Sequence, residues 1–288
     1  MAGDKKTALW LSYSSISDYL RCPRCYFLKS VYRDKATGKK IKVVSPALSL
    51  GQAVHEVLEG LSKLRVEDRF AKPLFSNFEL VWTKVSGRTG GFFSEEVEQA
   101  FKARGLAMLS LVTKNPDPLK KLAVKMSTDL PHYFLSEADN IVLCGKVEWL
   151  QYFPETDSVH IIDFKTSRFS EGPGSLQLPI YHLLVKNCQN RAIRGASYWY
   201  LESSDTPEER ILPDVEESAR RVLKIAKEIK LARTLEKLVC SDGSAGCNYC
   251  QPYEDVLAGK AERVKSDERY DYYAFNTSSL EPFDSEVL

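Results

Sequence analysis

The sequence predicts a mixed α/β fold, and three observations support this prediction. Helical patterns fill the first half of the chain, two strand-like segments flank a turn near its middle, and helical patterns then return. Of the 288 residues, 43% are hydrophobic and 27% are charged, which is the composition of a folded protein rather than of a disordered one. A chain of this length can bury a large core in one or two domains.

Three helical regions are expected before the strands. The first covers Ser14 to Tyr32 and is interrupted at Pro23, because proline lacks the backbone donor and clashes with the preceding turn. The second covers Ala47 to Leu64. The third is a mostly helical region over residues 67–138.

The strand-like segments are Ile141 to Phe153 and Val159 to Thr166, on either side of a turn-rich Pro154–Ser158. Further elements are expected after them. In chain order these are a helix over Leu176–Lys186, strands over Ala196–Glu202 and Arg210–Leu212, and a long helix over Pro213–Leu238.

Charge is unevenly distributed along a chain whose formal net charge is only +1. Residues 1–44 carry ten basic and three acidic side chains, a net charge of +7, while residues 251–288 carry four basic and nine acidic ones, a net charge of −5. The basic end can meet phosphates, or it is simply a solvated helix and loop. The acidic end is interpreted as a mobile tail.

The chain is expected to be a cytoplasmic protein that does not enter a membrane. No apolar run reaches the length of about 18 residues that a membrane-spanning helix needs, and the first ten residues lack a signal-peptide pattern. In a reducing compartment, the seven cysteines are interpreted as metal ligands or free thiols rather than as disulfides.

The densest chemical signal lies in GKVEW (145–149) and IIDFKTS (161–167). Asp163 and Lys165 are two residues apart on a predicted strand, so both point to one face. In one register of the hairpin Glu148 lies across from Asp163 on that face, whereas a one-residue slip turns it away. Two carboxylates there suit Mg²⁺ or Mn²⁺, and the lysine can orient water or neutralise charge on a phosphate. An exposed cluster of salt bridges is the alternative.

Two further pairs of side chains stand four residues apart on predicted helices, so each pair is stacked on one helix face. The segment GQAVHEVLE contains His55 and Glu59, and LQLPIYH contains Gln177 and Tyr181. Each pair alone is typical of an ordinary structural helix. Together with the hairpin they form an ordered set: a histidine, a glutamate, Asp-x-Lys and Gln-x-x-x-Tyr.

This ordered set resembles the RecB-like nucleases of the PD-(D/E)XK superfamily, which include bacterial helicase–nuclease domains and small CRISPR-associated nucleases that process new spacers. The segments that carry the resemblance span about residues 12–250 and are SYSSISDYLRCPRCYFL, GQAVHEVLE, GKVEW, IIDFKTS and LQLPIY. It implies a restriction-endonuclease-like core, a short mixed central sheet flanked by helices, with a helical insertion at about 67–138 and a C-terminal cysteine-rich segment. The expected organisation is a nuclease domain over residues 1–250 and an acidic C-terminal segment over residues 251–288.

The resemblance also implies a set of metal ligands. They would be His55, Glu148 and Asp163, with the backbone carbonyl of Phe164 as a further ligand. The group usually has aspartate where this chain has Glu148, and the longer side chain can still bind a metal. The cation would be Mg²⁺ or Mn²⁺, and an imidazole ligand makes Mn²⁺ more competitive.

Two C-x-x-C pairs, Cys22–Cys25 and Cys247–Cys250, are about 220 residues apart, so only the fold can bring them together. Four thiolates can hold a [4Fe–4S] cluster or Zn²⁺. Some members of the resembled group join their two ends with an iron–sulfur cluster on one N-terminal and three C-terminal cysteines. Here the expected ligands are the two pairs, with Cys240 as a reserve candidate; two unrelated thiol pairs are the alternative.

These features predict a metal-dependent DNA nuclease, with Lys165 as the catalytic lysine and with Gln177 and Tyr181 contacting DNA or organising the site. It would act on single-stranded DNA or DNA ends in repair, recombination or CRISPR adaptation, with a helicase or a CRISPR integrase as a candidate partner. The alternatives are a non-catalytic, metal-stapled nucleic-acid-binding or adaptor module with a degenerate nuclease fold, and an RNA-directed nuclease. The complete ligand and lysine set favours the enzyme.

Overall fold

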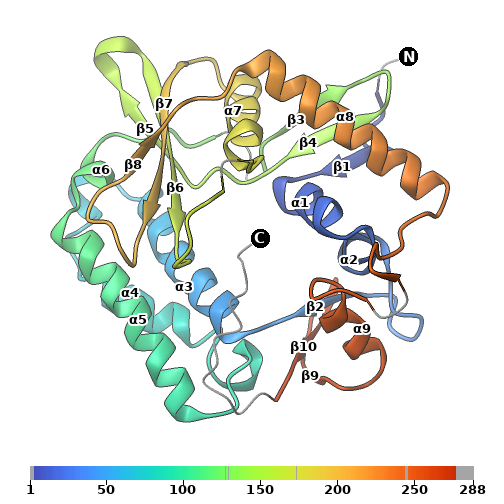
Figure 1. Ribbon diagram of the computed structural model, residues 1–288. Coiled ribbons are helices and arrows are strands. Elements are labelled where there is room, and N and C mark those ends of the chain that lie inside the picture. Colours follow the sequence, from blue (N-terminus) through green and yellow to red (C-terminus); the bar gives the residue numbers. More distant parts are fainter. Residues whose placement is uncertain (1–2, 127, 129, 173, 244–245, 277–288) are drawn as a thin grey trace. The chain divides into compact units, whose positions relative to one another are not determined.

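The computed structural model describes residues 3–276 except 127, 129, 173, 244 and 245 (Figure 1). It divides the chain into two compact units. The first comprises Met1–Tyr13, His55–Leu74 and Met108–Leu231, and the second comprises Ser14–Val54, Phe75–Ala107 and Ala232–Leu288. None of the helices formed by the described residues is both long enough and apolar enough to cross a membrane.

The first unit is built on a four-stranded mixed sheet in the order β5-β6-β7-β8. Its strands are β5 (Trp149–Phe153), β6 (Ser158–Lys165), β7 (Ala192–Tyr200) and β8 (Glu208–Arg210). β6 pairs antiparallel with β5 and parallel with β7, and β7 pairs antiparallel with β8. β6 is buried along most of its length, as expected for a central strand with neighbours on both sides.

A second, three-stranded sheet in this unit has the order β1-β4-β3. It is formed by β1 (Leu9–Leu11), β3 (His132–Ser136) and β4 (Ile141–Cys144). Helix α7 (Gln177–Cys188) contacts both β3 and β7 (Figure 1). The largest fully buried side chains of the four-stranded sheet are Trp149, Phe164 and Trp199. The remaining helical elements are η2 (Val66–Asp68), α6 (Asp117–Lys120), η4 (Pro154–Thr156) and most of α8 (Val215–Thr234).

The second unit combines helices with a three-stranded sheet in the order β2-β10-β9. The strands are β2 (Lys40–Val43), β9 (Glu262–Ser266) and β10 (Tyr270–Ala274). The helical elements in chain order are α1 (Tyr13–Arg21), α2 (Pro23–Tyr26), the π-helix η1 (Phe27–Val31), α4 (Leu74–Trp82), η3 (Gly87–Gly90) and α9 (Gln251–Leu257). Helices α3 (Pro46–Leu61) and α5 (Glu95–Lys114) contribute residues to both units.

The predicted mixed α/β class is confirmed, and so is the interruption of the first helix at Pro23, which begins α2. Three details differ from the prediction. Residues 132–136 form strand β3 rather than a helix. Residues 251–274 are not a free tail, because they form α9, β9 and β10; the last twelve residues lie outside the described part of the chain.

The third difference concerns the strand expected over Ile141 to Phe153, which is two strands in different sheets. A Cβ atom on Gly145 would lie 2.8 Å from the Leu184 side chain of α7, so only glycine allows this close approach. The chain leaves β4 at this point and reaches β5 four residues later. Glu148 therefore precedes β5 instead of lying within a long strand.

Candidate active site

The structure brings together all six side chains that the sequence singled out for catalysis. They come from three places in the first unit, which are helix α3, the β5–β6 pair and helix α7. The six are His55, Glu148, Asp163, Lys165, Gln177 and Tyr181.

Glu148 is held on the same side of the sheet as Asp163. The β5–β6 register pairs Trp149 with Ile162, so the next position along places Glu148 across from Asp163, which is one of the two registers that the sequence left open. Glu148 Oε2 accepts a hydrogen bond from the Phe164 backbone N–H at 2.7 Å, and Oε1 lies 2.6 Å from His55 Nδ1. The Glu148 carboxylate is thus fixed by one strand and one helix.

Lys165 and Gln177 connect the remaining members of the site. Lys165 Nζ lies 3.1 Å from Asp163 Oδ2 and donates a hydrogen bond to Gln177 Oε1. The Gln177 amide group in turn donates to Asp163 Oδ1 and to the Tyr181 hydroxyl, each at 3.3 Å. Gln177 and Tyr181 are one turn apart on α7, and both are buried.

Burial controls the ionisation of this cluster. Asp163 is 1% exposed, and its burial together with the nearby Glu148 charge raises its pKa to about 7, although Lys165 and His55 oppose the shift. Burial lowers the pKa of Lys165, but Asp163 and Glu171 outweigh it and raise the pKa above its ordinary value. Burial also lowers the pKa of His55, and the Glu148 carboxylate reverses this shift. Lys165 is therefore a cation at neutral pH.

The donor set fits a divalent cation. His55 Nδ1 and Asp163 Oδ2 are buried and form no hydrogen bond of good geometry with a described residue, although each lies beside an ion-pair partner. Native proteins seldom leave such atoms unsatisfied. Two carboxylates and an imidazole are ligands suited to Mg²⁺ or Mn²⁺, and a cation would offset the repulsion that raises the Asp163 pKa. The site therefore has both the chemistry and a reason to bind a metal.

Two neighbours of Lys165 were missed by sequence reasoning. Glu171, in the loop between β6 and α7, places Oε1 2.8 Å from Lys165 Nζ, and its backbone N–H donates to the Tyr200 hydroxyl at 3.0 Å. The Tyr198 ring centre lies 4.8 Å from Lys165 Nζ. Tyr198 pairs with Asp163 across the β6–β7 ladder, so the parallel register could have indicated it. Glu171 lies in an irregular loop, where no periodic pattern exists.

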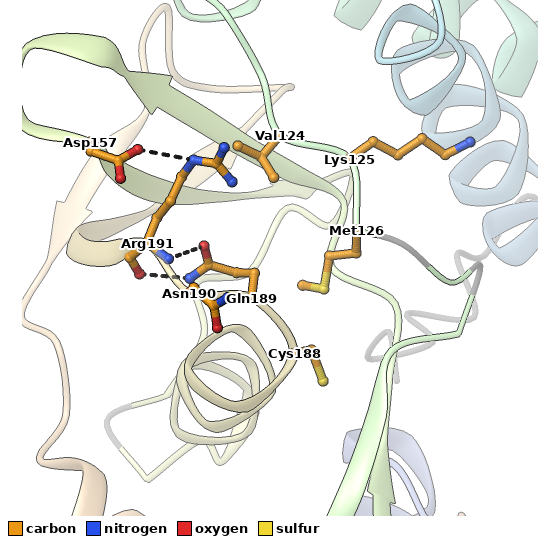
Figure 2. A pocket seen from close by; sticks show the side chains of 8 residues that line it. All are labelled: Val124, Lys125, Met126, Asp157, Cys188, Gln189, Asn190 and Arg191. Atoms are coloured by element: carbon orange, nitrogen blue, oxygen red, sulfur yellow. Dashed lines mark hydrogen bonds and ion pairs between the residues drawn. The ribbon is translucent and has the colours of Figure 1, made fainter.

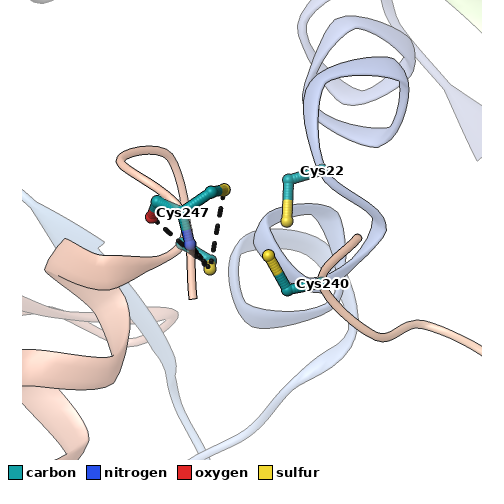
Figure 3. Close-up of side chains that lie close together, drawn as sticks. Cys22, Cys240 and Cys247 are labelled. Atoms are coloured by element: carbon teal, nitrogen blue, oxygen red, sulfur yellow. Dashed lines mark hydrogen bonds between the residues drawn. The ribbon is translucent and has the colours of Figure 1, made fainter. Parts of the chain in front are cut away.

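The second unit contains a four-cysteine group made of Cys22, Cys240, Cys247 and Cys250. Their sulfur atoms all lie within 4.8 Å of one another. Among the described residues no other set of three or more histidine, cysteine or acidic side chains is gathered in this way, and His55, Glu148 and Asp163 do not form such a compact group. Figure 3 shows the side chains of Cys22 and Cys240 pointing toward each other. Thiolates about 2.3 Å from a single tetrahedral Zn²⁺ lie roughly 3.8 Å from one another, so sulfur atoms this close suit one metal ion, whereas the four irons of a [4Fe–4S] cluster would hold the cysteine sulfurs farther apart.

One member of this group differs from the prediction. Cys240, the reserve candidate, joins the group, whereas Cys25 does not. The Cys25 backbone N–H donates to Cys22 Sγ at 3.4 Å, so Cys25 supports a ligand through its backbone. The group thus draws one cysteine from the N-terminal segment and three from the C-terminal segment.

A pocket of about 380 Å³ lies elsewhere in the first unit (Figure 2). It is lined by residues 124–126 and 188–191 together with Asp157. Arg191 forms an ion pair with Asp157 at 3.2 Å, and Lys125 is the remaining charged residue of the lining. None of the six active-site residues lines it.

Comparisons with known proteins relate the chain to a family of nucleases. A sequence model described as the PD-(D/E)XK nuclease superfamily matches residues 10–256, a span that includes the six active-site residues and all four grouped cysteines. Among solved structures, a protein from Eubacterium rectale with the provisional name of exonuclease is 13% identical, with a TM-score of 0.44 and coverage of 84% of this chain and 87% of that one. No curated protein matches the chain significantly.

Proposed function

The chain belongs to the PD-(D/E)XK nuclease superfamily, and from this premise we propose that it is a divalent-metal-dependent deoxyribonuclease of the RecB-like group. The observation that carries the proposal is the convergence of His55, Glu148, Asp163 and Lys165 in one buried network. Its substrate would be single-stranded DNA or DNA ends, in repair, recombination or CRISPR adaptation. A cytoplasmic location and a helicase or CRISPR integrase as partner belong to the same proposal.

His55, Glu148 and Asp163 would hold Mg²⁺ or Mn²⁺, with the Phe164 carbonyl as a further ligand. When bound, the cation supplies an activated water for attack on the phosphodiester and neutralises negative charge on the phosphate. The protein keeps both carboxylates in place through the Phe164 N–H and the Gln177 amide group. This fixed arrangement avoids reorganisation during the reaction.

Lys165 stabilises the charge that develops on the phosphate in the transition state. It is suited to this role because it remains protonated beside Asp163 and Glu171 and is oriented by Gln177. In the free protein the Glu171 carboxylate forms an ion pair with Lys165 Nζ. An incoming phosphate would displace this carboxylate and pair with the same ammonium group. Gln177 and Tyr181 take the organising role rather than direct contact with DNA, since both are buried.

The four-cysteine group would hold a [4Fe–4S] cluster or Zn²⁺, on Cys22, Cys240, Cys247 and Cys250. Its support is the mutual proximity of the sulfur atoms and the burial of Cys22 and Cys250. Its role would be structural, because it ties the beginning of the second unit to the end of the chain.

The test is cleavage of end-labelled single-stranded DNA, duplex DNA and RNA by the full-length protein with Mg²⁺, with Mn²⁺ and without a divalent metal. Wild type should cleave DNA only with metal, and Asp163→Asn should be inactive while remaining folded, as judged by circular dichroism. Cleavage of RNA in preference to DNA would identify the protein as a ribonuclease instead. Absence of cleavage by the metal-replete protein would favour a non-catalytic nucleic-acid-binding module.

A further inference from the structure

One face of the three-stranded sheet in the second unit combines lysines with tyrosines. Tyr272 on the central strand β10 pairs directly with Lys42 on β2 and with Lys265 on β9, and Tyr270 pairs with Lys40. Cross-strand partners share a face, and so do residues two apart on one strand. We call this surface, made of Lys40, Lys42, Lys265, Tyr270 and Tyr272, the lysine–tyrosine face.

Lys42 and Lys265 lie near the two tyrosine rings, and the rings lie near each other. Lys42 Nζ is 5.4 Å from the centre of the Tyr272 ring and 6.0 Å from that of Tyr270, and Lys265 Nζ is 5.5 Å from Tyr272. The two ring centres are 6.1 Å apart. The lysine ammonium groups therefore surround a pair of adjacent aromatic rings.

This face is directed outward, whereas the opposite face of the sheet is internal. Lys42 and Lys265 are exposed. On the opposite face, Ile41 and Asp271 are buried, and the Asp271 carboxylate accepts hydrogen bonds from the Thr37 and Ser266 hydroxyls. The polar groups of the internal face are thus satisfied within the fold.

The positive charge of the lysine–tyrosine face is only partly compensated. Neither Lys42 nor Lys265 forms an ion pair with a carboxylate among the described residues, but the Asp267 carboxylate accepts a hydrogen bond from the Tyr272 hydroxyl at 2.7 Å and attracts both lysines. Three lysines on one face against this one carboxylate leave a net positive charge, which favours an anionic ligand.

We propose that the lysine–tyrosine face binds single-stranded nucleic acid. Bases stack on Tyr270 and Tyr272, and the lysines neutralise the neighbouring phosphates. Grooves that bind single strands without sequence preference combine these two elements, and stacking contributes about 1–3 kcal/mol per base. A membrane surface or an acidic peptide would satisfy the lysines but would not use two adjacent rings. The lysine ammonium groups move from the rings onto phosphates when bases occupy the rings.

This binding site is separate from the six catalytic residues, which lie in the first unit. The proposal therefore goes beyond the nuclease activity and can be tested without cleavage. The probe is a fluorescent oligothymidine of about 15 nucleotides, compared with an abasic strand of equal length that keeps the phosphates but has no bases. Binding to the full-length protein is measured by anisotropy without divalent metal, over a series of salt concentrations.

The two kinds of contact predict different losses. Tyr272→Ala should weaken oligothymidine binding about tenfold and leave abasic binding unchanged, while Tyr272→Phe, which keeps the ring, should bind like wild type. Lys42→Gln with Lys265→Gln should weaken binding of both strands and reduce the slope of log affinity against log salt by about 1.4. The matched control is Lys35→Gln with Lys260→Gln, which removes the same net charge from exposed positions of the same unit and should leave that slope unchanged.

Three results would overturn the proposal. The first is that the two double lysine variants lose the same affinity for oligothymidine. The second is that Tyr272→Ala weakens binding of oligothymidine and of the abasic strand equally. The third is that vesicles containing phosphatidylserine bind as tightly as oligothymidine and that the same variants weaken this binding. The tyrosine variant could unfold the sheet, so the exposed lysine pair provides the independent test. If the protein cleaves DNA but all variants bind oligothymidine equally, the nuclease proposal stands and the lysine–tyrosine face is not a binding site. If the protein does not cleave DNA but the variants lose binding as predicted, the binding site stands and the nuclease proposal fails.

Discussion

Arg69 is a buried cation that holds the active-site scaffold together. It is 5% exposed, and its guanidinium donates hydrogen bonds to the carbonyls of Leu61 at 3.1 Å and of Leu119 and Lys121 at 2.7 Å each. It also lies 4.9 Å from the centre of the Trp149 ring. Leu61 ends helix α3, which carries His55, and Trp149 follows Glu148, so Arg69 links the elements that supply two of the proposed metal ligands.

The cost of Arg69→Ala follows from these contacts. Each of the three hydrogen bonds contributes about 1 kcal/mol net, and the ring contact contributes about 1 kcal/mol, so we expect a loss of about 4 kcal/mol in the free energy of unfolding. No carboxylate among the described residues pairs with Arg69, and burial lowers the pKa of its guanidinium. Its contribution therefore comes from carbonyls and an aromatic ring rather than from an ion pair.

The measurement is urea unfolding of the metal-free protein followed by tryptophan fluorescence. Arg69→Lys should give an intermediate loss, because an ammonium group keeps the charge but cannot reach three carbonyls in the same fork geometry. The control is Arg65→Ala in the same segment. The Arg65 side chain is 82% exposed and pairs with Glu67, so its loss should change stability by less than about 0.5 kcal/mol. Similar losses from Arg69→Ala and Arg65→Ala would refute this reasoning.

Three further predictions concern the two sites. Cys240→Ser should reduce the metal content of the purified protein, while Cys25→Ser should leave it unchanged. The opposite result would show that Cys25, rather than Cys240, is the fourth ligand, as the two C-x-x-C pairs predicted. Because burial raises the native pKa of Asp163 to about 7, above its ordinary value, the metal-free wild type loses stability as pH rises from about 4 to about 7. Asp163→Asn should therefore raise the melting temperature more at about pH 8 than at about pH 5, and a difference independent of pH would contradict this. Glu171→Gln should lower the KM for nucleic acid without lowering kcat, since the carboxylate no longer competes for Lys165; a raised KM would show that Glu171 assists binding.

Alternation along the strands restricted the register of the candidate catalytic hairpin, although the sequence left two registers open for Glu148. Ile162 and Phe164 must face the core, which leaves Asp163 and Lys165 on the other side of β6. The turn then leaves few registers for the preceding strand, and Trp149 does pair with Ile162. Local patterns sufficed wherever a strand or a helix determined the direction of a side chain.

Contacts between segments far apart in the chain could not be predicted from the sequence. Cys240 joins the four-cysteine group although it belongs to neither C-x-x-C pair, because proximity in the fold replaces spacing in the sequence. The strands β9 and β10 were not predicted, because β9 (ERVKS) is mostly polar and β10 (YDYYA) lies in a segment whose acidic composition is typical of a tail. The sheet containing β1 and β4 joins segments about 130 residues apart, and no local pattern encodes that pairing.

We propose that Lys165 and its neighbours form a metal-dependent phosphodiesterase site. The most direct test of this site is single-turnover cleavage of end-labelled DNA with Mn²⁺, comparing wild type with Lys165→Ala and with Lys146→Ala. Lys146 lies close in sequence to Glu148 but is exposed and pairs with Glu59, so it is the matched control. We predict that Lys165→Ala lowers the cleavage rate on the order of 10²-fold or more and that Lys146→Ala leaves it nearly unchanged. Equal rates for wild type and Lys165→Ala would contradict the account.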